Sequence, residues 1–250
     1  MRIGLISSGL LAILLICSAA AARLAAPAAL PIAPEPLVTI STLRPGVSAP
    51  DFSLADTKGD KHSISDLTTA GKVVVLEWFS PDCPEVAKYR SESTFMNDTA
   101  AHFSDQQLAW LAIDSEAVGK DGKTDNAAIE QFAKDHKLPP VLLDRDGTIG
   151  HKYGVTTTPT VFVINRHGTV VYSGAPDAST ALDNKPSETN YLRSAISAAV
   201  LDKQPLTGQT LAVGCSIDFA PAKPVTSLVT IPLPKPAPRT RPPARPMPQR

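Results

Sequence analysis

The fold of this chain is decided by residues 73–84, which read VVVLEWFSPDCP. The first seven, 73–79, are mainly β-branched or aromatic, a composition typical of a buried strand. The Ser-Pro pair that follows predicts a turn. Pro84 suits the first position of a helix, because its missing amide proton costs nothing there. The stretch therefore predicts a strand, a turn and a helix, with Cys83 at the junction.

Further strands and helices follow this unit along the chain. Apolar β-prone runs predict strands, and apolar residues at helical spacing predict two of the helices. A helix over 84–102 is predicted because proline stands only at its start, where a helix accepts it. The predicted strands are 108–113, 141–143, 160–164 and 169–172, and the predicted helices are 84–102, 126–136 and 191–201. The run NRHG at 165–168 predicts the turn of a β-hairpin. This order predicts an α/β domain with a mixed sheet.

Cys83 is the residue with the clearest chemistry. A thiol at a helix N-terminus faces unpaired backbone N–H groups and the positive end of the helix dipole, and both favour the nucleophilic thiolate. Asp82 and Glu85 beside it act in the opposite direction. The sequence leaves two interpretations open, a reactive cysteine and a buried structural one.

Charge is distributed unevenly along the chain. The 250 residues include 24 basic and 24 acidic side chains, so the formal net charge is zero. Residues 51–220 carry 15 basic and 23 acidic residues, whereas 221–250 carry six basic residues, ten prolines and no acid. We expect no nucleic-acid partner. An apolar content of 43% excludes a wholly disordered chain, and three cysteines are too few for a disulfide-stapled scaffold.

The N-terminus has the pattern of an export signal. In residues 1–22 a basic start precedes an apolar run and a cluster of small residues. Cleavage there would place the protein in the periplasm or cell envelope. The alternative is an uncleaved membrane anchor, because the uncharged run 3–22 can span a bilayer. Cleavage would leave two cysteines, Cys83 and Cys215, as a candidate disulfide outside the cytosol.

Two proline-rich segments flank the part of the chain that can fold. Residues 23–44 are an Ala/Pro-rich linker, in which proline prevents a long helix. Residues 219–250 are a basic, proline-rich tail that composition predicts to be disordered. The alternative is a tail that contacts an anionic envelope surface or a proline-binding partner.

Three segments together resemble one protein family. They are 45–56 (PGVSAPDFSLAD) with SDL at 65–67, then 73–83, then 153–172 (YGVTTTPTVFVINRHGTVVY). In this order they resemble the redoxins, the alkyl hydroperoxide reductase/thiol-specific antioxidant branch of the thioredoxin-like superfamily. The resemblance implies a redoxin domain over residues 45–218. Its expected fold is a central mixed sheet flanked by helices, with an N-terminal β-hairpin extension.

The resemblance also implies roles for individual residues. Cys83 falls at the family's attacking cysteine, with Ser80 and Pro84 beside it in the active-site turn. Thr158 and Pro159 fall at a cis-proline dipeptide that packs against this cysteine. In the family, the residue before that proline offers its backbone to an extended peptide substrate.

One further residue matches a family position, and two residues differ from the family's motifs. Glu77 falls where thioredoxins carry a buried acid that can relay protons to a thiol, and the alternative is an exposed Glu on an edge strand. Val86 stands where a C-x-x-C motif needs its second cysteine. Leu76 stands where peroxiredoxins have a proline, although Ser80 and Cys83 keep the S-x-x-C spacing.

Cys215 is the candidate partner of Cys83. It follows the last predicted helix and lies next to a glycine. We predict that it resolves Cys83 by forming an internal disulfide during turnover. The alternative is a permanent staple that holds the C-terminal segment down.

These features predict an exported thiol–disulfide oxidoreductase of redoxin type that acts on protein or small-molecule thiols and disulfides. One alternative is a thiol-dependent peroxidase, an antioxidant that reduces hydroperoxides. Another is a non-catalytic thioredoxin-fold module with a structural Cys83–Cys215 disulfide. We expect no cofactor. We also expect no metal, because the five histidines are scattered and none pairs with a cysteine at ligand spacing.

Overall fold

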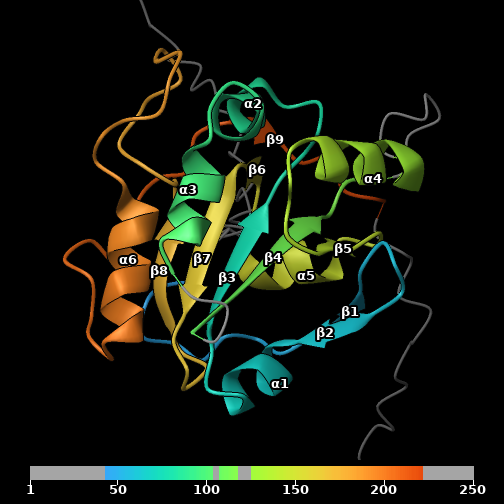
Figure 1. Cartoon of the computed structure of the whole chain (residues 1–250). Coiled ribbons are helices and arrows are strands. Elements are labelled where there is room, and N and C mark those ends of the chain that lie inside the picture. Colours follow the sequence, from blue (N-terminus) through green and yellow to red (C-terminus); the bar gives the residue numbers. More distant parts are fainter. Residues whose placement is uncertain (1–42, 104–106, 118–124, 222–250) are drawn as a thin grey trace, which may run out of the picture. The chain divides into compact units, whose positions relative to one another are not determined.

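The strand predicted over 73–79 lies at the centre of a five-stranded mixed sheet (Figure 1). The computed structural model describes residues 43–103, 107–117 and 125–221. The strands, in spatial order, are β5 (Val141–Leu143), β4 (Leu108–Asp114), β3 (Val73–Trp78), β7 (Thr160–Ile164) and β8 (Val170–Gly174). β3 is parallel to β4 and antiparallel to β7, which confirms the predicted mixed sheet.

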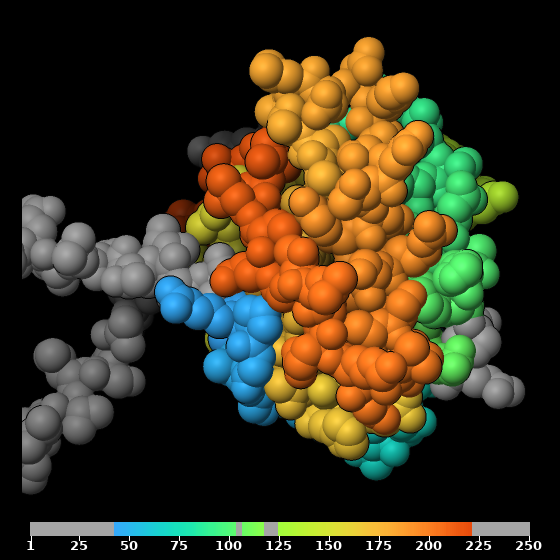
Figure 2. Space-filling view, turned by 90° about the vertical axis from the view of Figure 1, so that its left-hand side faces the viewer, coloured from blue at the N-terminus to red at the C-terminus, as the bar shows by residue number. Residues whose placement is uncertain are grey.

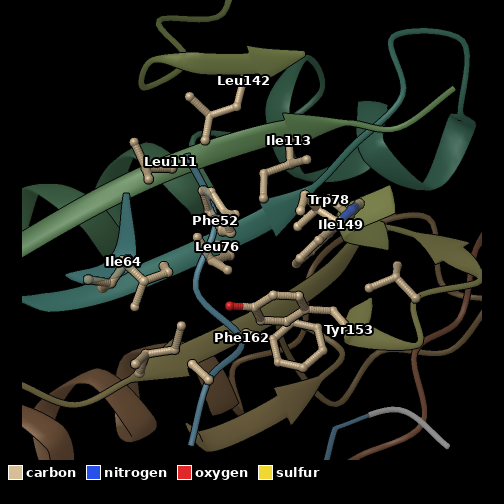
Figure 3. Close-up of a cluster of buried hydrophobic side chains, with 14 of the residues drawn as sticks. Phe52, Ile64, Leu76, Trp78, Leu111, Ile113, Leu142, Ile149, Tyr153 and Phe162 are labelled. Atoms are coloured by element: carbon tan, nitrogen blue, oxygen red, sulfur yellow. The ribbon is translucent and has the colours of Figure 1, made fainter. Parts of the chain in front are cut away.

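All six residues of β3 are buried, because helices cover both faces of the sheet. Val74, Leu76 and Trp78 pack into one apolar cluster, where Trp78 contacts the rings of Tyr153 and Phe162 (Figure 3). The alternate residues of β3 face the opposite cluster. Successive strand residues point to opposite faces, so one strand that is apolar except for Glu77 supplies both cores.

In the part of the chain that the structure describes, six helices surround the sheet (Figure 1). They are α1 (Ile64–Thr69), α2 (Pro84–Arg90), α3 (Phe95–Ala101), α4 (Asn126–Asp135), α5 (Thr148–Tyr153) and α6 (Tyr191–Val200). Buried residues of α2, α3 and α6 share one cluster, and those of α1 and α5 share the other. The predicted helices at α4 and α6 are confirmed, whereas α1 and α5 were not predicted.

The prediction of one helix over 84–102 is wrong, because α2 and α3 are separate. The amides of Ser91 and Glu92 both donate to the carbonyl of Ala87, at 2.8 Å each. The hydroxyl of Ser93 then donates to the carbonyl of Lys88 at 2.7 Å. Serine side chains compete with helical backbone hydrogen bonds, so this polar stretch ends the helix.

The N-terminal β-hairpin expected from the family resemblance is present. It consists of β1 (Ser53–Ala55) and β2 (Lys61–Ser63), paired antiparallel. The turn between them includes Gly59, whose φ of 92° lies in the left-handed region that favours glycine.

The chain after α6 returns across the surface of the domain. Figure 2 shows it as a continuous orange-red band that runs beside the blue N-terminal segment. The amide of Ser173 on β8 donates to the carbonyl of Gly208 at 3.1 Å. The band continues to the two-residue strand β9 (Cys215–Ser216), which pairs with β6 (Thr157–Thr158). We call residues 208–219 the C-terminal strap.

The predicted terminal segments lie mostly outside the described residues. This applies to the export signal or anchor at 1–22, to the linker at 23–44 except its last two residues, and to the tail at 219–250 except 219–221. Within the described ranges, no helix is both long and apolar enough to cross a membrane.

A buried ion pair joins α2 to the sheet. Glu77 on β3 is completely buried and pairs with Arg90, the last residue of α2. Arg90 Nε donates to Glu77 Oε1 at 2.9 Å, and Trp110 Nε1 donates to Glu77 Oε2 at 2.9 Å. Arg90 also donates to Asn97 of α3 at 2.9 Å. The alternative of an exposed Glu77 on an edge strand is therefore wrong.

We expect Arg90→Met to reduce the free energy of unfolding by about 3–5 kcal/mol, because Glu77 would be left buried without its counter-charge. Urea titration of the full chain measures this. Arg193→Met on the exposed face of α6 is the matched control. The double variant Glu77→Gln/Arg90→Met should recover part of the loss, because it removes the buried charge. Equal stability of Arg90→Met and the control would contradict this account.

Candidate active site

Cys83 lies at the predicted junction between β3 and α2. It is the N-cap residue of α2, and Pro84 occupies the first helical turn, as predicted. Only 2% of its surface is exposed. It forms a disulfide with Cys215, with the two Cα atoms 5.8 Å apart. The predicted pairing of these two cysteines is therefore confirmed.

The loop that contacts Cys83 contains the predicted cis proline. The Thr158–Pro159 peptide bond is cis, and the carbonyl oxygen of Thr158 lies 3.3 Å from Cys83 Sγ. Thr158 is buried, and the hydroxyl of Thr160 donates to the carbonyl of Thr157 at 2.6 Å. The fold thus brings together two segments 75 residues apart that the sequence linked only through the family resemblance.

The edge of this loop is occupied by the chain itself. β9 pairs antiparallel with β6, so that Cys215 lies opposite Thr158 and Ser216 opposite Thr157. The amide of Ile217 extends the pairing by donating to the carbonyl of Thr156 at 3.0 Å. Cys215 therefore reaches Cys83 as part of an extended segment hydrogen-bonded beside the cis proline.

Gly214 permits this close approach. Its φ of +159° is rarely adopted by other residues, and a Cβ placed there would lie 1.9 Å from the carbonyl oxygen of Thr158. A real Cβ cannot come that close, so glycine is required before Cys215 in this arrangement. The close approach of Gly214 to the carbonyl oxygen of Thr158 explains why a glycine precedes Cys215.

The C-terminal strap is anchored on both sides of Cys215. Before it, Thr210 Oγ1 accepts from the amide of Ala175 at 2.9 Å and lies 2.6 Å from the hydroxyl of Tyr172. After it, the ring of Phe219 stacks on His151 with the centroids 4.1 Å apart. These contacts do not depend on the disulfide, so they favour a strap that keeps Cys215 close to Cys83 after reduction.

The active-site turn is linked to an acidic side chain that sequence reasoning missed. The amide of Cys83 donates to the carbonyl of Ser80 at 3.2 Å, and Ser80 is buried. The side chain of Ser80 lies close enough to Glu116, which follows β4, to influence its pKa. The carboxyl ends of the parallel strands β3 and β4 meet at one edge of the sheet, and this placement could have identified Glu116 from the sequence.

Burial is the main cause that raises the pKa of Glu116 above its ordinary value of 4.5. The polar side chain of Ser80 opposes the shift, while the charges of Asp114, Asp82 and Asp218 add to it. Asp218 belongs to the C-terminal strap, and its carbonyl accepts from the amide of Ala117 at 2.8 Å. The pKa of Glu116 therefore depends on whether the C-terminal strap, with Asp218, lies in this position.

Glu77 occupies a different environment from Glu116. Its carboxylate oxygens bond to Arg90 and Trp110 rather than to Cys83. Its role as a proton relay stays a prediction, and the contacts support a part in holding α2 on the sheet.

The comparisons with known proteins agree with this geometry. A model of the AhpC/TSA family matches residues 45–173, just over half of the chain. The chain belongs to the AhpC/TSA family. The matched residues include Cys83 and the cis proline but end before the C-terminal strap. The second cysteine of this family member thus comes from outside the family's matched region.

Curated relatives carry the name thiol-disulfide oxidoreductase ResA. The protein of Geobacillus kaustophilus (strain HTA426) is 32% identical over 126 residues, which is 50% of this chain and 66% of that protein. The protein of Bacillus subtilis (strain 168) is 34% identical over 127 residues, or 50% of this chain and 64% of that protein. In both cases this AhpC/TSA protein spans just under two thirds of the relative.

Solved structures extend the likeness beyond the family match. A hypothetical protein from Sinorhizobium meliloti 1021 has a TM-score of 0.63 at 25% identity, covering 72% of this chain and 97% of its own. An uncharacterized conserved protein from Geobacillus kaustophilus has a TM-score of 0.64 at 22% identity, covering 73% and 95%. Both likenesses concern the fold, and each covers nearly all of the other chain.

We expect Gly214→Ala to slow formation of the Cys83–Cys215 disulfide about 10-fold or more, a change equivalent to about 1.4 kcal/mol. The reason is the clash of the new Cβ with the carbonyl of Thr158. Reduced protein would be oxidised, alkylated at timed intervals and resolved by gel shift. Gly71→Ala is the control, because Gly71 also has a positive φ but has open space around it. Equal rates for the two variants would refute the steric role of Gly214.

We expect Glu116→Gln to alter how stability depends on pH. A raised pKa means that the folded protein binds this proton more tightly than the unfolded chain. The contribution is therefore complete below the unfolded pKa of 4.5 and is lost as pH rises through the folded pKa. Glutamine resembles the protonated acid, so the variant should gain in Tm over wild type as pH rises from about 4 to 7.

Thermal unfolding at a series of pH values tests this expectation. Glu188→Gln, at an exposed position, is the control and should differ from wild type by a constant amount. A constant offset for Glu116→Gln would contradict the coupling.

Proposed function

We propose that the protein is a thiol–disulfide oxidoreductase in which Cys83 exchanges with substrate disulfides and Cys215 resolves the product. One observation carries the proposal: the Cys83–Cys215 disulfide lies against the cis-proline loop, with Cys215 held in an extended strand. A strand paired in this way has the geometry of a bound peptide that shares a disulfide with Cys83. The names of the relatives support the same class of activity.

The reductive cycle follows from these positions. The Cys83 thiolate attacks a substrate disulfide, forms a mixed disulfide and expels one substrate thiolate. Cys215 then attacks Cys83 Sγ, which forms the internal disulfide and expels the second substrate thiolate. Two electrons pass from the protein to the substrate, and an external dithiol must restore the cysteine pair. Protein or small-molecule disulfides are suitable substrates.

The backbone of Thr158 has a second role in this proposal. The edge of Thr158 that pairs with Cys215 is the edge we assign to an extended substrate segment. Pro159 and Pro84 shape the groove around Cys83, and Ser80 holds the turn through its contact with the Cys83 amide. The strap and a substrate would use the same edge, so they would exclude each other.

We place the activity outside the cytosol, in the periplasm or cell envelope. Support comes from the signal-like sequence at 1–22 and from the persistence of disulfides in oxidising compartments. The basic tail suits contact with an anionic envelope surface, since residues 221–250 carry six basic residues and no acid.

A thiol-dependent peroxidase is the second candidate, favoured by the S-x-x-C spacing of Ser80 and Cys83 and by the family. Here Cys83 attacks a hydroperoxide, releases an alcohol and becomes a sulfenic acid. Cys215 condenses with it to give the same disulfide and water. Both candidates use the same two cysteines, so the substrate distinguishes them.

Turnover by single-cysteine variants tests the proposal. Reduced full-length protein would be mixed with an insulin disulfide substrate or with hydrogen peroxide, with dithiothreitol as the external reductant. We expect Cys83→Ser to abolish insulin reduction. Cys215→Ser should stop at a mixed disulfide between Cys83 and insulin, because the resolving thiol is missing.

Three outcomes separate the alternatives. Full turnover by Cys215→Ser would overturn the resolving role. Peroxide consumption without insulin reduction would select the peroxidase. An internal disulfide that resists dithiothreitol in the folded protein would identify a structural staple.

A further inference from the structure

One edge of the central sheet is open along the first half of β4. Within the described residues, β5 pairs with β4 only over residues 112–114, so residues 108–111 have no strand beside them on that side (Figure 1). A pocket of about 450 Å³ lies along this open stretch, and we call it the β4-edge pocket. Because β3 and β4 are parallel, it lies toward the end of the sheet away from Cys83, which follows β3.

The walls of the β4-edge pocket are largely apolar and come from β4, α3, α1 and the turn after α4. The apolar side chains include Leu67, Phe103, Leu108, Trp110, Leu138 and Pro139. A volume of about 300–1,000 Å³ and apolar walls with a few polar groups are typical of small-molecule sites. Pro139 and Pro140 also line the pocket, and proline beside a sheet edge opposes the pairing of an added strand. The pocket therefore suits a small molecule better than an extended peptide.

The charged groups of the β4-edge pocket are all of one sign. Among the described residues that line it there is no Asp or Glu, and those able to carry positive charge are His62, Lys72, Arg90 and Lys137. Arg90 is neutralised by the buried acid described above, and His62 Nε2 lies 3.0 Å from Asp56 Oδ2. Lys72 and Lys137 form no ion pair in the part of the chain that the structure describes. The lining thus carries two positive charges without a counter-charge.

The backbone of Lys137 is not the one that a lysine favours. Lys137 follows the end of α4 with a φ of 52°, in the left-handed region where glycine is the usual residue. The amide of Leu138 donates to the carbonyl of Ala133 at 2.9 Å, which is the hydrogen bond expected at such a helix end. The turn alone therefore favours glycine at position 137 and does not explain a lysine. Non-glycine residues in this backbone region are concentrated at functional sites.

We propose that the β4-edge pocket binds an amphipathic carboxylate, a small molecule with an apolar chain and one anionic head group. The apolar walls bury the chain, and removal of apolar surface from water supplies affinity. Lys72 and Lys137 attract the carboxylate as flexible point charges. The inference does not depend on the proposed oxidoreductase cycle.

Tryptophan fluorescence tests the proposal, because Trp110 lines the pocket and Trp78 is the only other tryptophan of the chain. Full-length protein would be titrated with 11-bromoundecanoate below the concentration at which it forms micelles, since bromine quenches a nearby indole. We expect saturable quenching. The uncharged 11-bromoundecanol should bind about 10-fold more weakly, because it lacks the charge that the two lysines attract.

Charge variants locate the site. Lys72→Gln and Lys137→Gln should each weaken the binding of 11-bromoundecanoate about 3-fold, and the double variant should weaken it about 10-fold. Lys134→Gln is the matched control, because Lys134 is an exposed lysine in the last turn of α4 and does not line this pocket. The control should bind like the wild type.

A glycine variant separates binding from folding at position 137. Glycine suits the left-handed backbone, so Lys137→Gly should keep or raise the Tm of the wild type while it weakens binding as Lys137→Gln does. A lower Tm with unchanged binding would contradict the role assigned to Lys137.

Two results would overturn the inference. One is quenching that does not saturate, or that is equally strong for the carboxylate and the alcohol. The other is equal affinity of the Lys72→Gln/Lys137→Gln double variant and the Lys134→Gln control. The insulin assay measures a different site, so either result would leave the proposed function standing.

Discussion

The structure of the site depends on the antiparallel pairing of β9 with β6. This two-residue contact places Cys215 opposite Thr158 and thereby on Cys83, and it works because Gly214 lets the backbones approach. Without it, Cys83 would face an open cis-proline loop. With this pairing, the C-terminal strap lies as an extended segment beside the cis-proline loop and brings the thiol of Cys215 to Cys83.

The placement of the second cysteine changes what the family framework can do. In a C-x-x-C motif both thiols lie in one turn of helix, whereas Val86 occupies that position here and the partner comes from 132 residues away. A resolving thiol on a separate segment can move independently of the turn. In the proposed cycle, the contacts of Thr210 and Phe219 would limit how far this segment moves, and with it the access of substrate to Cys83.

Local patterns predicted the elements that propensity controls. The β-prone run of β3, apolar except for Glu77, the proline at the start of α2 and the hairpin turn at 165–168 each act within a few residues, and they were identified correctly. The break between α2 and α3 was missed because no proline marks it, whereas the polar run RSEST at 90–94 ends the helix and the Ser93 hydroxyl bonds to the carbonyl of Lys88. Glu116 and the Arg90 partner of Glu77 were missed because each depends on contacts between different elements.

The sequence by itself determined the α/β fold, the position of Cys83 between strand and helix, and the two cysteines able to pair. Only the tertiary structure decided how they pair, which sulfur is buried and which acid lies beside the active-site turn. The physical reason is that strand and helix formation follow from side-chain periodicity along the chain. The β6–β9 contact, by contrast, joins only two residue pairs, and long-range packing of the strap fixes it.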